Sequence, residues 1–182
     1  MSTYVVLLRG INVGGKNKLP MAELRQFLEA LGYSNVSTFI ASGNVLLTSN
    51  RSPARIKSEI EAKLPGAFRL DSELIAVLVL TADQLRAVVK KRPAGFGDQP
   101  AKYHSDAVFL MGIDADEAMT VFNPREGVDT VWPGDGVIYS QRLSAQRTKS
   151  RLGRIVGTPA YASMTIRSWQ TTLALLELMR KR

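Results

Sequence analysis

The sequence contains no cysteine and only one histidine, His104. The absence of cysteine excludes disulfides, thiol catalysis, iron–sulfur clusters and zinc fingers, and a lone histidine excludes any site that needs two. No apolar run approaches the ~20 residues of a membrane-spanning helix, because the longest extends only from Leu74 to Leu80. The run Tyr4–Leu8 is too short for the core of a signal peptide. We therefore expect a cytoplasmic protein with no membrane partner.

The remaining composition is typical of a globular protein. The chain has 182 residues, of which 45% are hydrophobic and 22% charged, enough for one domain or two small ones. Its net charge of +8 is uneven, with +6 in residues 1–95, −6 in residues 96–139 and +8 in residues 140–182. The basic segments could attract phosphate backbones or other anions. The alternatives are a solvated helix face, or a basic tail that docks on the acidic segment of the same chain.

The hydrophobic pattern of residues 1–80 predicts the order β-α-β-β-α-β. The predicted strands are 3–8, 36–40, 45–48 and 74–80, and the predicted helices are 20–31 and 53–64. Pro65-Gly66 is expected to end the second helix, and the capping box Thr81–Gln84 to begin another that stops before Pro93. This order is the ferredoxin-like split βαβ unit of an α+β protein.

The second half is predicted to be a smaller α+β unit. A linker is expected at 92–102, because it contains two prolines and two glycines, so the predicted domains are 1–92 and 103–182. The expected elements are a strand 107–111, a helix 114–122, a hairpin 128–140, a helix 144–156 and a C-terminal helix 168–180. This βαββα order is an incomplete echo of the first half. No close residue identity joins the halves, so a duplication is suggested by topology alone.

The loop Arg9–Lys18 is the most unusual segment. Its pattern Gly10-x-x-x-x-Gly15-Lys16 resembles a phosphate-binding P-loop, but Asn17 stands where the P-loop needs Ser or Thr for magnesium. Leu19-Pro20 also delays the following helix, and the predicted strand order lacks a parallel sheet. A P-loop nucleoside triphosphatase is therefore not expected.

The same loop does predict an anion-binding site. In a split βαβ unit, the loop after the first strand and the turn after the second lie at one sheet edge, so 9–18 and 42–44 are predicted neighbours. Glycine backbone and basic side chains near a helix start favour anions. The predicted ligand-binding residues are Arg9, Asn12, Gly14, Gly15, Lys16, Asn17, Lys18, Ser42, Asn44 and Arg167. The alternative is an ordered loop whose Asn and Gly residues satisfy local turns. His104 is expected at the surface, and Trp169 in the core rather than stacked on a base.

Several motifs resemble the bacterial family called domain of unknown function 1697. They are Leu7-Leu8-Arg9-Gly10-Ile11-Asn12-Val13-Gly14-Gly15-Lys16-Asn17-Lys18, Pro20-Met21-x-Glu23-Leu24-Arg25, Leu28-Glu29-x-Leu31-Gly32-Tyr33 and Ser42-Gly43-Asn44-Val45, with Thr165–Thr171 near the C-terminus. The resemblance implies a small soluble α+β protein, and it brings no activity or catalytic residues. This chain has Ala41 and Ser168 where the family usually has Gln and Asn.

Three functional hypotheses follow. The leading one is a binding protein for phosphate-bearing ligands, nucleic acid or nucleotide, although strands one and three lack the aromatic stripe of common RNA-binding sheets. The second is an enzyme on a small phosphorylated substrate, which ranks lower because no nucleophile or general base is evident. The third is a structural or interaction protein without a ligand. No metal or cofactor is expected, and the oligomeric state is left open.

Overall fold

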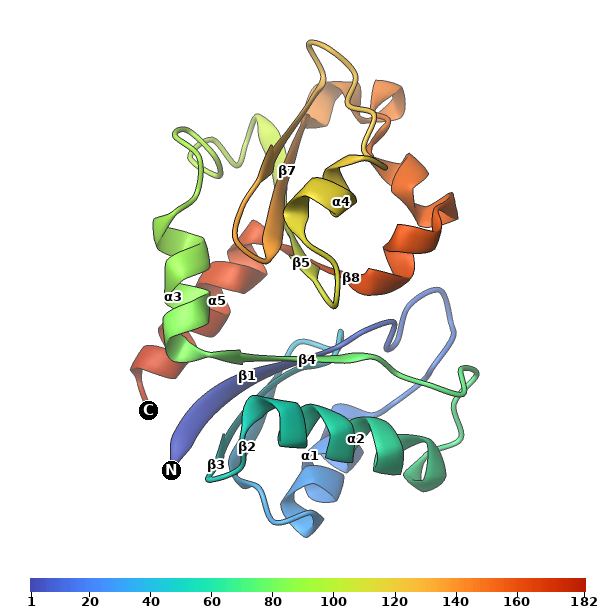
Figure 1. Ribbon diagram of the computed structural model, residues 1–182, viewed down its shortest axis with the longest axis vertical. Helices are drawn as coiled ribbons and strands as arrows, with labels where there is room; N and C mark the ends of the chain where they lie inside the picture. Colours follow the sequence, from blue (N-terminus) through green and yellow to red (C-terminus); the bar gives the residue numbers. More distant parts are fainter. The chain divides into compact units, whose positions relative to one another are not determined.

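The computed structural model describes residues 1–182, and their contacts divide the chain into two compact units. The first unit contains residues 1–85 and 175–182, and the second contains residues 86–174. Each unit holds one four-stranded antiparallel sheet, so the protein belongs to the α+β class (Figure 1). These limits differ from the predicted boundaries at 92 and 103. The division into domains 1–92 and 103–182 stays a prediction.

The first unit has the ferredoxin-like order that the sequence predicts. Its elements are β1 (Ser2–Leu8), α1 (Met21–Ala30), β2 (Ser34–Phe39), β3 (Asn44–Ser49), α2 (Pro53–Ala67), β4 (Val77–Thr81) and the start of α3 (Ala82–Lys90). The strands lie in the order β2-β3-β1-β4, all neighbours being antiparallel. Figure 1 shows α1 and α2 on the same face of this sheet. The loop after β1 and the turn after β2 consequently lie at one edge.

Local signals explain most helix ends in this unit. The Ser52 hydroxyl accepts a hydrogen bond from the backbone N–H of Arg55, and Pro53 occupies the first turn of α2. The predicted stop of α2 at Pro65 is wrong, because the helix continues to Ala67. Pro65 removes one N–H from the last turn, but the bond from Phe68 N–H to the Leu64 carbonyl still closes that turn.

The capping box before α3 forms as predicted, whereas the strand before it is shorter than expected. The backbone N–H of Gln84 donates to the Thr81 hydroxyl, and the Gln84 amide oxygen accepts from Thr81 N–H. β4 begins only at Val77, and Leu74, the first residue of the predicted strand, is 60% exposed. An apolar run therefore overestimates the strand by three residues.

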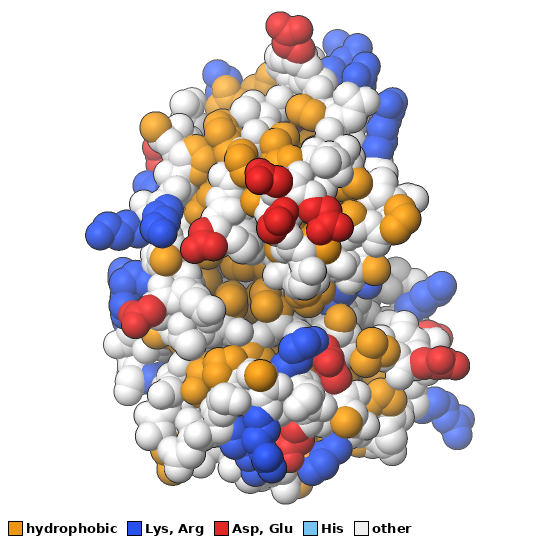
Figure 2. Space-filling model, in the orientation of Figure 1, with side chains coloured by type: hydrophobic (Ala, Val, Ile, Leu, Met, Phe, Trp, Pro, Cys, Tyr) orange, Lys and Arg blue, Asp and Glu red, His pale blue; other side chains and the backbone are white.

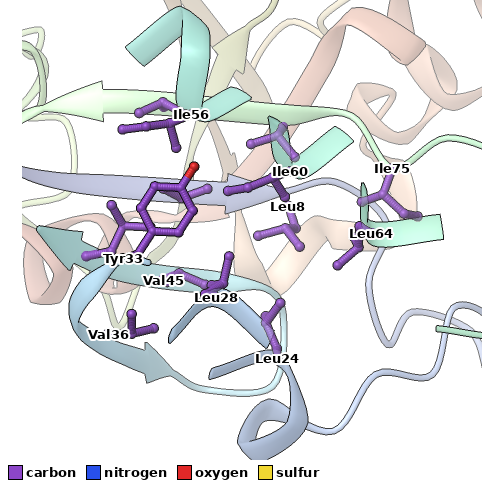
Figure 3. Packing of buried hydrophobic residues seen from close by; sticks show 14 of the residues in the cluster. Leu8, Leu24, Leu28, Tyr33, Val36, Val45, Ile56, Ile60, Leu64 and Ile75 are labelled. Atoms are coloured by element: carbon purple, nitrogen blue, oxygen red, sulfur yellow. The ribbon is translucent and has the colours of Figure 1, made fainter. Parts of the chain in front are cut away.

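Aliphatic side chains from both helices and the sheet form the core of the first unit (Figure 3). The residues labelled there are Leu8, Leu24, Leu28, Tyr33, Val36, Val45, Ile56, Ile60, Leu64 and Ile75. Their i, i+4 spacing along α1 and α2 places one stripe of each helix on the sheet. The core thereby fixes β1 and β2, whose C-terminal ends carry the predicted binding segments.

The second unit repeats the strand order of the first. Its elements are β5 (Tyr103–Leu110), α4 (Ala115–Met119), β6 (Asp129–Pro133), β7 (Val137–Leu143), the 3₁₀ helices η1 (Ser144–Lys149), η2 (Leu152–Gly157) and η3 (Pro159–Ser163), β8 (Met164–Ser168), and α5 (Trp169–Arg180), of which only the first residues belong to this unit. The sheet order is β6-β7-β5-β8, which matches β2-β3-β1-β4 element for element. The echo that the sequence suggested is therefore complete in the strands.

The second half differs from the prediction most clearly after β7, although β5 also begins four residues earlier than expected and α4 ends three residues earlier. The helix expected at 144–156 is replaced by η1 and η2, and β8 was not predicted. The backbone N–H of Arg151 donates to the Asp129 carboxylate at 2.8 Å instead of to a helical carbonyl. Ser150, just before it, has an extended backbone with ψ of 144°. A tertiary hydrogen bond thus overrides the helical pattern at this point.

The segment 92–102, for which a linker was predicted, packs into an aromatic cluster of the second unit through Phe96. The segment connects α3 to β5 without regular structure, but Phe96 is fully buried. The Phe96 ring packs edge-on against Trp169 at 5.0 Å and Tyr139 at 5.2 Å between ring centroids. Trp169 is 2% exposed, which confirms its predicted place in the core. The connection is therefore a packed part of the second unit.

Candidate functional site

The loop after β1 ends in a tight hairpin. The backbone N–H of Lys16 donates to the Val13 carbonyl at 3.0 Å, and Gly14 and Gly15 between them have φ of 59° and 74°. Two successive positive φ angles define a type I′ turn, for which glycine is the favoured residue. Nothing lies within 4 Å of where a Cβ would stand on either glycine. The glycines therefore form an open tip.

This geometry differs from that of a phosphate-binding P-loop. The segment turns back on itself, since Asn12 N–H donates to the Asn17 carbonyl at 3.1 Å. α1 begins only at Met21, after Pro20 in extended conformation. The sheet is antiparallel throughout. The P-loop-like pattern therefore describes a hairpin rather than a helix N-terminus that cradles phosphate.

Asn17 fastens the hairpin to the segment before β4. Its side chain is 6% exposed and makes four hydrogen bonds of 3.0 Å. The amide nitrogen donates to the Gly10 carbonyl and the Ser72 hydroxyl, and the amide oxygen accepts from the N–H groups of Asp71 and Ser72. Its φ of 48° is one that asparagine tolerates better than most residues. Asn17 thus holds the loop from inside.

Asn12 joins the same loop to the turn after β2. Its amide nitrogen donates to the Leu19 carbonyl at 2.9 Å and to the Ala41 carbonyl at 2.7 Å. Its amide oxygen accepts from Leu19 N–H at 2.8 Å. The structure therefore brings the two predicted segments together across 29 residues of sequence. The contact uses the backbone of Ala41, so it does not depend on the departure from the family residue there.

The turn between β2 and β3 spans residues 40–43. Asn44, predicted within the turn, is the first residue of β3 and is fully buried. Its amide nitrogen donates to the Phe39 carbonyl and to the Ser42 hydroxyl. Gly43 has φ of 81°, and a Cβ there would lie 3.0 Å from Leu8. Glycine is needed at 43 because the turn packs directly on the end of β1.

The cationic side chains of the loop differ in exposure. Lys16 and Lys18 are exposed and form no ion pair, whereas Arg9 is half-buried and its backbone N–H bonds to the Ala76 carbonyl. Exposed Asp71 and Glu73 lie on the segment that holds Asn17, and they reduce the net positive charge of this edge. The structure therefore assembles two solvent-accessible lysines on a rigid hairpin.

Arg167, the tenth predicted binding residue, lies in β8 of the second unit rather than in the first. It is 8% exposed, and its guanidinium donates to the Thr165 hydroxyl at 3.0 Å and the Ile166 carbonyl at 2.9 Å. Burial lowers its pKa to about 10. The neighbouring Ser168 hydroxyl accepts from Thr171 N–H, a capping bond for which serine and asparagine are both favoured residue types.

Sequence reasoning missed a cluster of charged residues on β5, β6 and β7. His104 Nε2 lies 3.0 Å from the Asp106 carboxylate, and burial raises the pKa of Asp106. Asp129 Oδ1 and the Nε atoms of Arg142 and Arg151 are buried without a hydrogen bond. The spacing of His104 and Asp106 places both on one face of a strand, but their position beside the expected linker concealed this signal.

A hollow lies at the edge of the second sheet that corresponds to the loop edge of the first sheet. Its volume is about 430 Å³, and its lining includes Asp114, Asp116 and Asp135. Figure 2 shows acidic side chains gathered over the part of this unit where Figure 1 draws α4. Asp114 already accepts a capping bond from Glu117 N–H. No three His, Asp or Glu side chains are arranged to hold a metal ion, and no helix is long and apolar enough to cross a membrane.

Comparison with known proteins identifies relatives without assigning an activity. The chain is similar to the solved structure of conserved bacterial protein SP0830 from Streptococcus pneumoniae, with 28% sequence identity and a TM-score of 0.81. The alignment covers 98% of each chain. Residues 1–139 match the family described as "Protein of unknown function (DUF1697)". No curated protein matches the chain.

Proposed function

Because the chain belongs to the DUF1697 family, whose function is unknown, its relatives bring it no activity, and we propose a function from its own residues. The protein binds phosphate-bearing ligands, nucleic acid or nucleotide, through loop 9–18 and turn 42–44. A cytoplasmic location, where such ligands are abundant, is part of this proposal. The observation that carries it is the pair of exposed lysines, Lys16 and Lys18, on a hairpin fastened by two asparagines.

The rigidity of the hairpin supports the proposal. Asn12 and Asn17 together make seven side-chain hydrogen bonds within this edge of the first unit. The loop is therefore ordered by folding, so a ligand does not bear the entropic cost of ordering it. In this proposal Asn12, Asn17 and Asn44 position the loop, and the lysines contact the ligand.

The open tip supports close approach by a ligand. Gly14 and Gly15 carry no side chain, and both are exposed. Lysine ammonium groups bind phosphate as point charges and need no fixed geometry. A phosphate can therefore approach the backbone at the tip while Lys16 and Lys18 neutralise its charge.

Titration of labelled nucleic acid tests the proposal. Fluorescence anisotropy with single-stranded RNA and duplex DNA at about 50 and 200 mM salt measures affinity and its salt dependence. The variant Lys16→Ala/Lys18→Ala is expected to weaken binding, and to reduce the slope of log K against log salt by about 1.8 on a duplex and about 1.4 on a single strand. Competition by ATP tests the nucleotide form of the proposal.

A matched control separates the loop from general charge. Lys90→Ala/Lys91→Ala removes the same two charges from exposed positions at and just after the end of α3. If both double variants lose affinity equally, the loop is not the binding site. If the unmodified protein binds neither nucleic acid nor ATP at the lower salt, the proposal is wrong, and the enzyme and ligand-free alternatives take its place.

A further inference from the structure

Two aliphatic side chains are exposed at the same sheet edge as Lys16 and Lys18. Val13 is 61% exposed just before the glycine tip, and Ile40 is 54% exposed at the start of the turn after β2. The hydrogen bond from Asn12 to the Ala41 carbonyl joins the residue before Val13 to the residue after Ile40. The loop and the turn therefore present apolar groups beside the cationic ones.

The backbone conformation at Ile40 is unfavourable for an isoleucine. Its φ is 50°, a left-handed conformation that costs a β-branched residue strain. The other non-glycine residues with positive φ are Asn12, Asn17 and Asn35, which are of the type that tolerates it. An exposed isoleucine therefore adds both backbone strain and apolar surface where asparagine or glycine would add neither. Contact with a ligand gives this residue a role that folding does not.

Resting on the proposed function, we infer that the ligand is single-stranded nucleic acid. Val13 and Ile40 contact the apolar faces of unpaired bases, and Lys16 and Lys18 contact the adjoining phosphates. Unpaired nucleotides present both chemistries within one repeating unit, whereas a duplex hides its base faces by stacking. Every base has such a face, so this contact needs no particular sequence.

The charge of this edge and the small exposed apolar area favour single-stranded nucleic acid over a protein partner or a membrane. Exposed Asp71 and Glu73 limit the net attraction for a polyanion, so contacts with bases must supply part of the affinity. Two aliphatic side chains offer far less than the ~800 Å² that each partner buries in a stable protein interface. They also fall short of the continuous apolar face of a helix that lies on a membrane.

The test compares three anionic probes and one pair of substitutions. The probes are a labelled 12-nucleotide single strand, the corresponding duplex, and inorganic polyphosphate as competitor. Val13→Ser/Ile40→Asn is expected to lose about fivefold in affinity for the single strand while its affinity for polyphosphate is unchanged. Ile40→Asn alone is expected to raise the thermal midpoint by about 2–4 °C, because it relieves the left-handed strain. A merely structural isoleucine would instead lower it.

The outcomes separate this inference from the proposed function. If Val13→Ser/Ile40→Asn binds all three probes as the unmodified protein does, while Lys16→Ala/Lys18→Ala weakens all three, the inference of a single-stranded ligand is wrong and phosphate binding stands. If the lysine variant changes nothing, both are wrong. Binding to anionic phosphatidylglycerol vesicles, or a dimer in light scattering, that the Val13/Ile40 substitutions abolish would assign the apolar pair to a membrane or a second copy and overturn the inference.

Discussion

Replacing Asn17 by alanine measures how firmly the candidate site is built. The substitution removes four hydrogen bonds of 3.0 Å from a side chain that is 6% exposed. Each such bond contributes about 1 kcal/mol net, and the left-handed backbone costs alanine about 1 kcal/mol more. Asp71 and Ser72 are exposed, so water replaces part of the lost bonding. We expect Asn17→Ala to lower the free energy of unfolding by about 3 kcal/mol.

Equilibrium urea unfolding followed by far-UV circular dichroism checks this value. Tryptophan fluorescence is unsuitable, because Trp132 and Trp169 both lie in the second unit whereas Asn17 lies in the first. For an m-value of about 2–3 kcal/mol/M, the transition midpoint falls by about 1–1.5 M. Amide hydrogen exchange at Asp71 and Ser72 is expected to accelerate, since both N–H groups lose their acceptor.

Two further variants assign the loss to its causes. Asn17→Gly accepts the backbone conformation but still loses the hydrogen bonds, so it should lose about 1 kcal/mol less than Asn17→Ala. Asn50→Ala changes the same side chain at an exposed position that makes no side-chain hydrogen bond, and should cost under about 0.5 kcal/mol. Equal stability of the Asn17→Ala and Asn50→Ala proteins would refute the argument that Asn17 fastens the loop.

Two predictions concern the second unit. Burial by itself would raise the pKa of Asp129, but hydrogen bonds from the backbone N–H groups of Arg151 and Arg125 hold it below its ordinary value. The stabilisation that the Asp129 carboxylate contributes to folding is therefore present above the unfolded pKa of about 3.9 and is lost as pH falls through the lower folded pKa. Asp129→Asn should consequently be less stable at pH 7 and lose less stability in acid. Parallel pH profiles of the two proteins in urea unfolding would contradict this. Gly97→Ala puts a Cβ 2.4 Å from Trp169 and should lower the free energy of unfolding by about 2–4 kcal/mol. Gly95 has a similar left-handed backbone but open space around it, so Gly95→Ala should cost only about 1 kcal/mol. Equal thermal midpoints of the two variants would contradict the close contact at Gly97.

The predictable part of the fold is the part whose signals are local. The i, i+4 stripes, the Ser52 and Asp114 caps and the Thr81–Gln84 capping box each act within four residues, and all are present. β8 and the 3₁₀ segment depend on distant partners, such as the bond between Arg151 and Asp129, which no local pattern reveals. The burial of Phe96 was not predicted either, because its partners Tyr139 and Trp169 are distant in sequence and the residues around it are rich in proline and glycine.

The candidate site also has a part that the sequence predicts and a part that it does not. The meeting of loop 9–18 with the turn after β2 follows from topology, and the bond from Asn12 to Ala41 confirms it. The sequence does not show which polar side chains face inward, because asparagine can serve a turn or a ligand equally well. The side chains of Asn17 and Asn44 form hydrogen bonds within the protein. Val13 and Ile40 were not predicted as site residues, because they carry no polar group, although both are exposed.

The repeated strand order also gives the protein an electrostatic polarity. Corresponding edges of the two sheets carry opposite charge, with Lys16 and Lys18 on the first and Asp114, Asp116 and Asp135 around the hollow of the second. The proposed function therefore predicts that a polyanion binds at the edge of the first sheet and not at the corresponding edge of the second. Two units with one strand order thus differ in the sign of the charged side chains at this edge, so the backbone plan alone does not determine what the edge attracts.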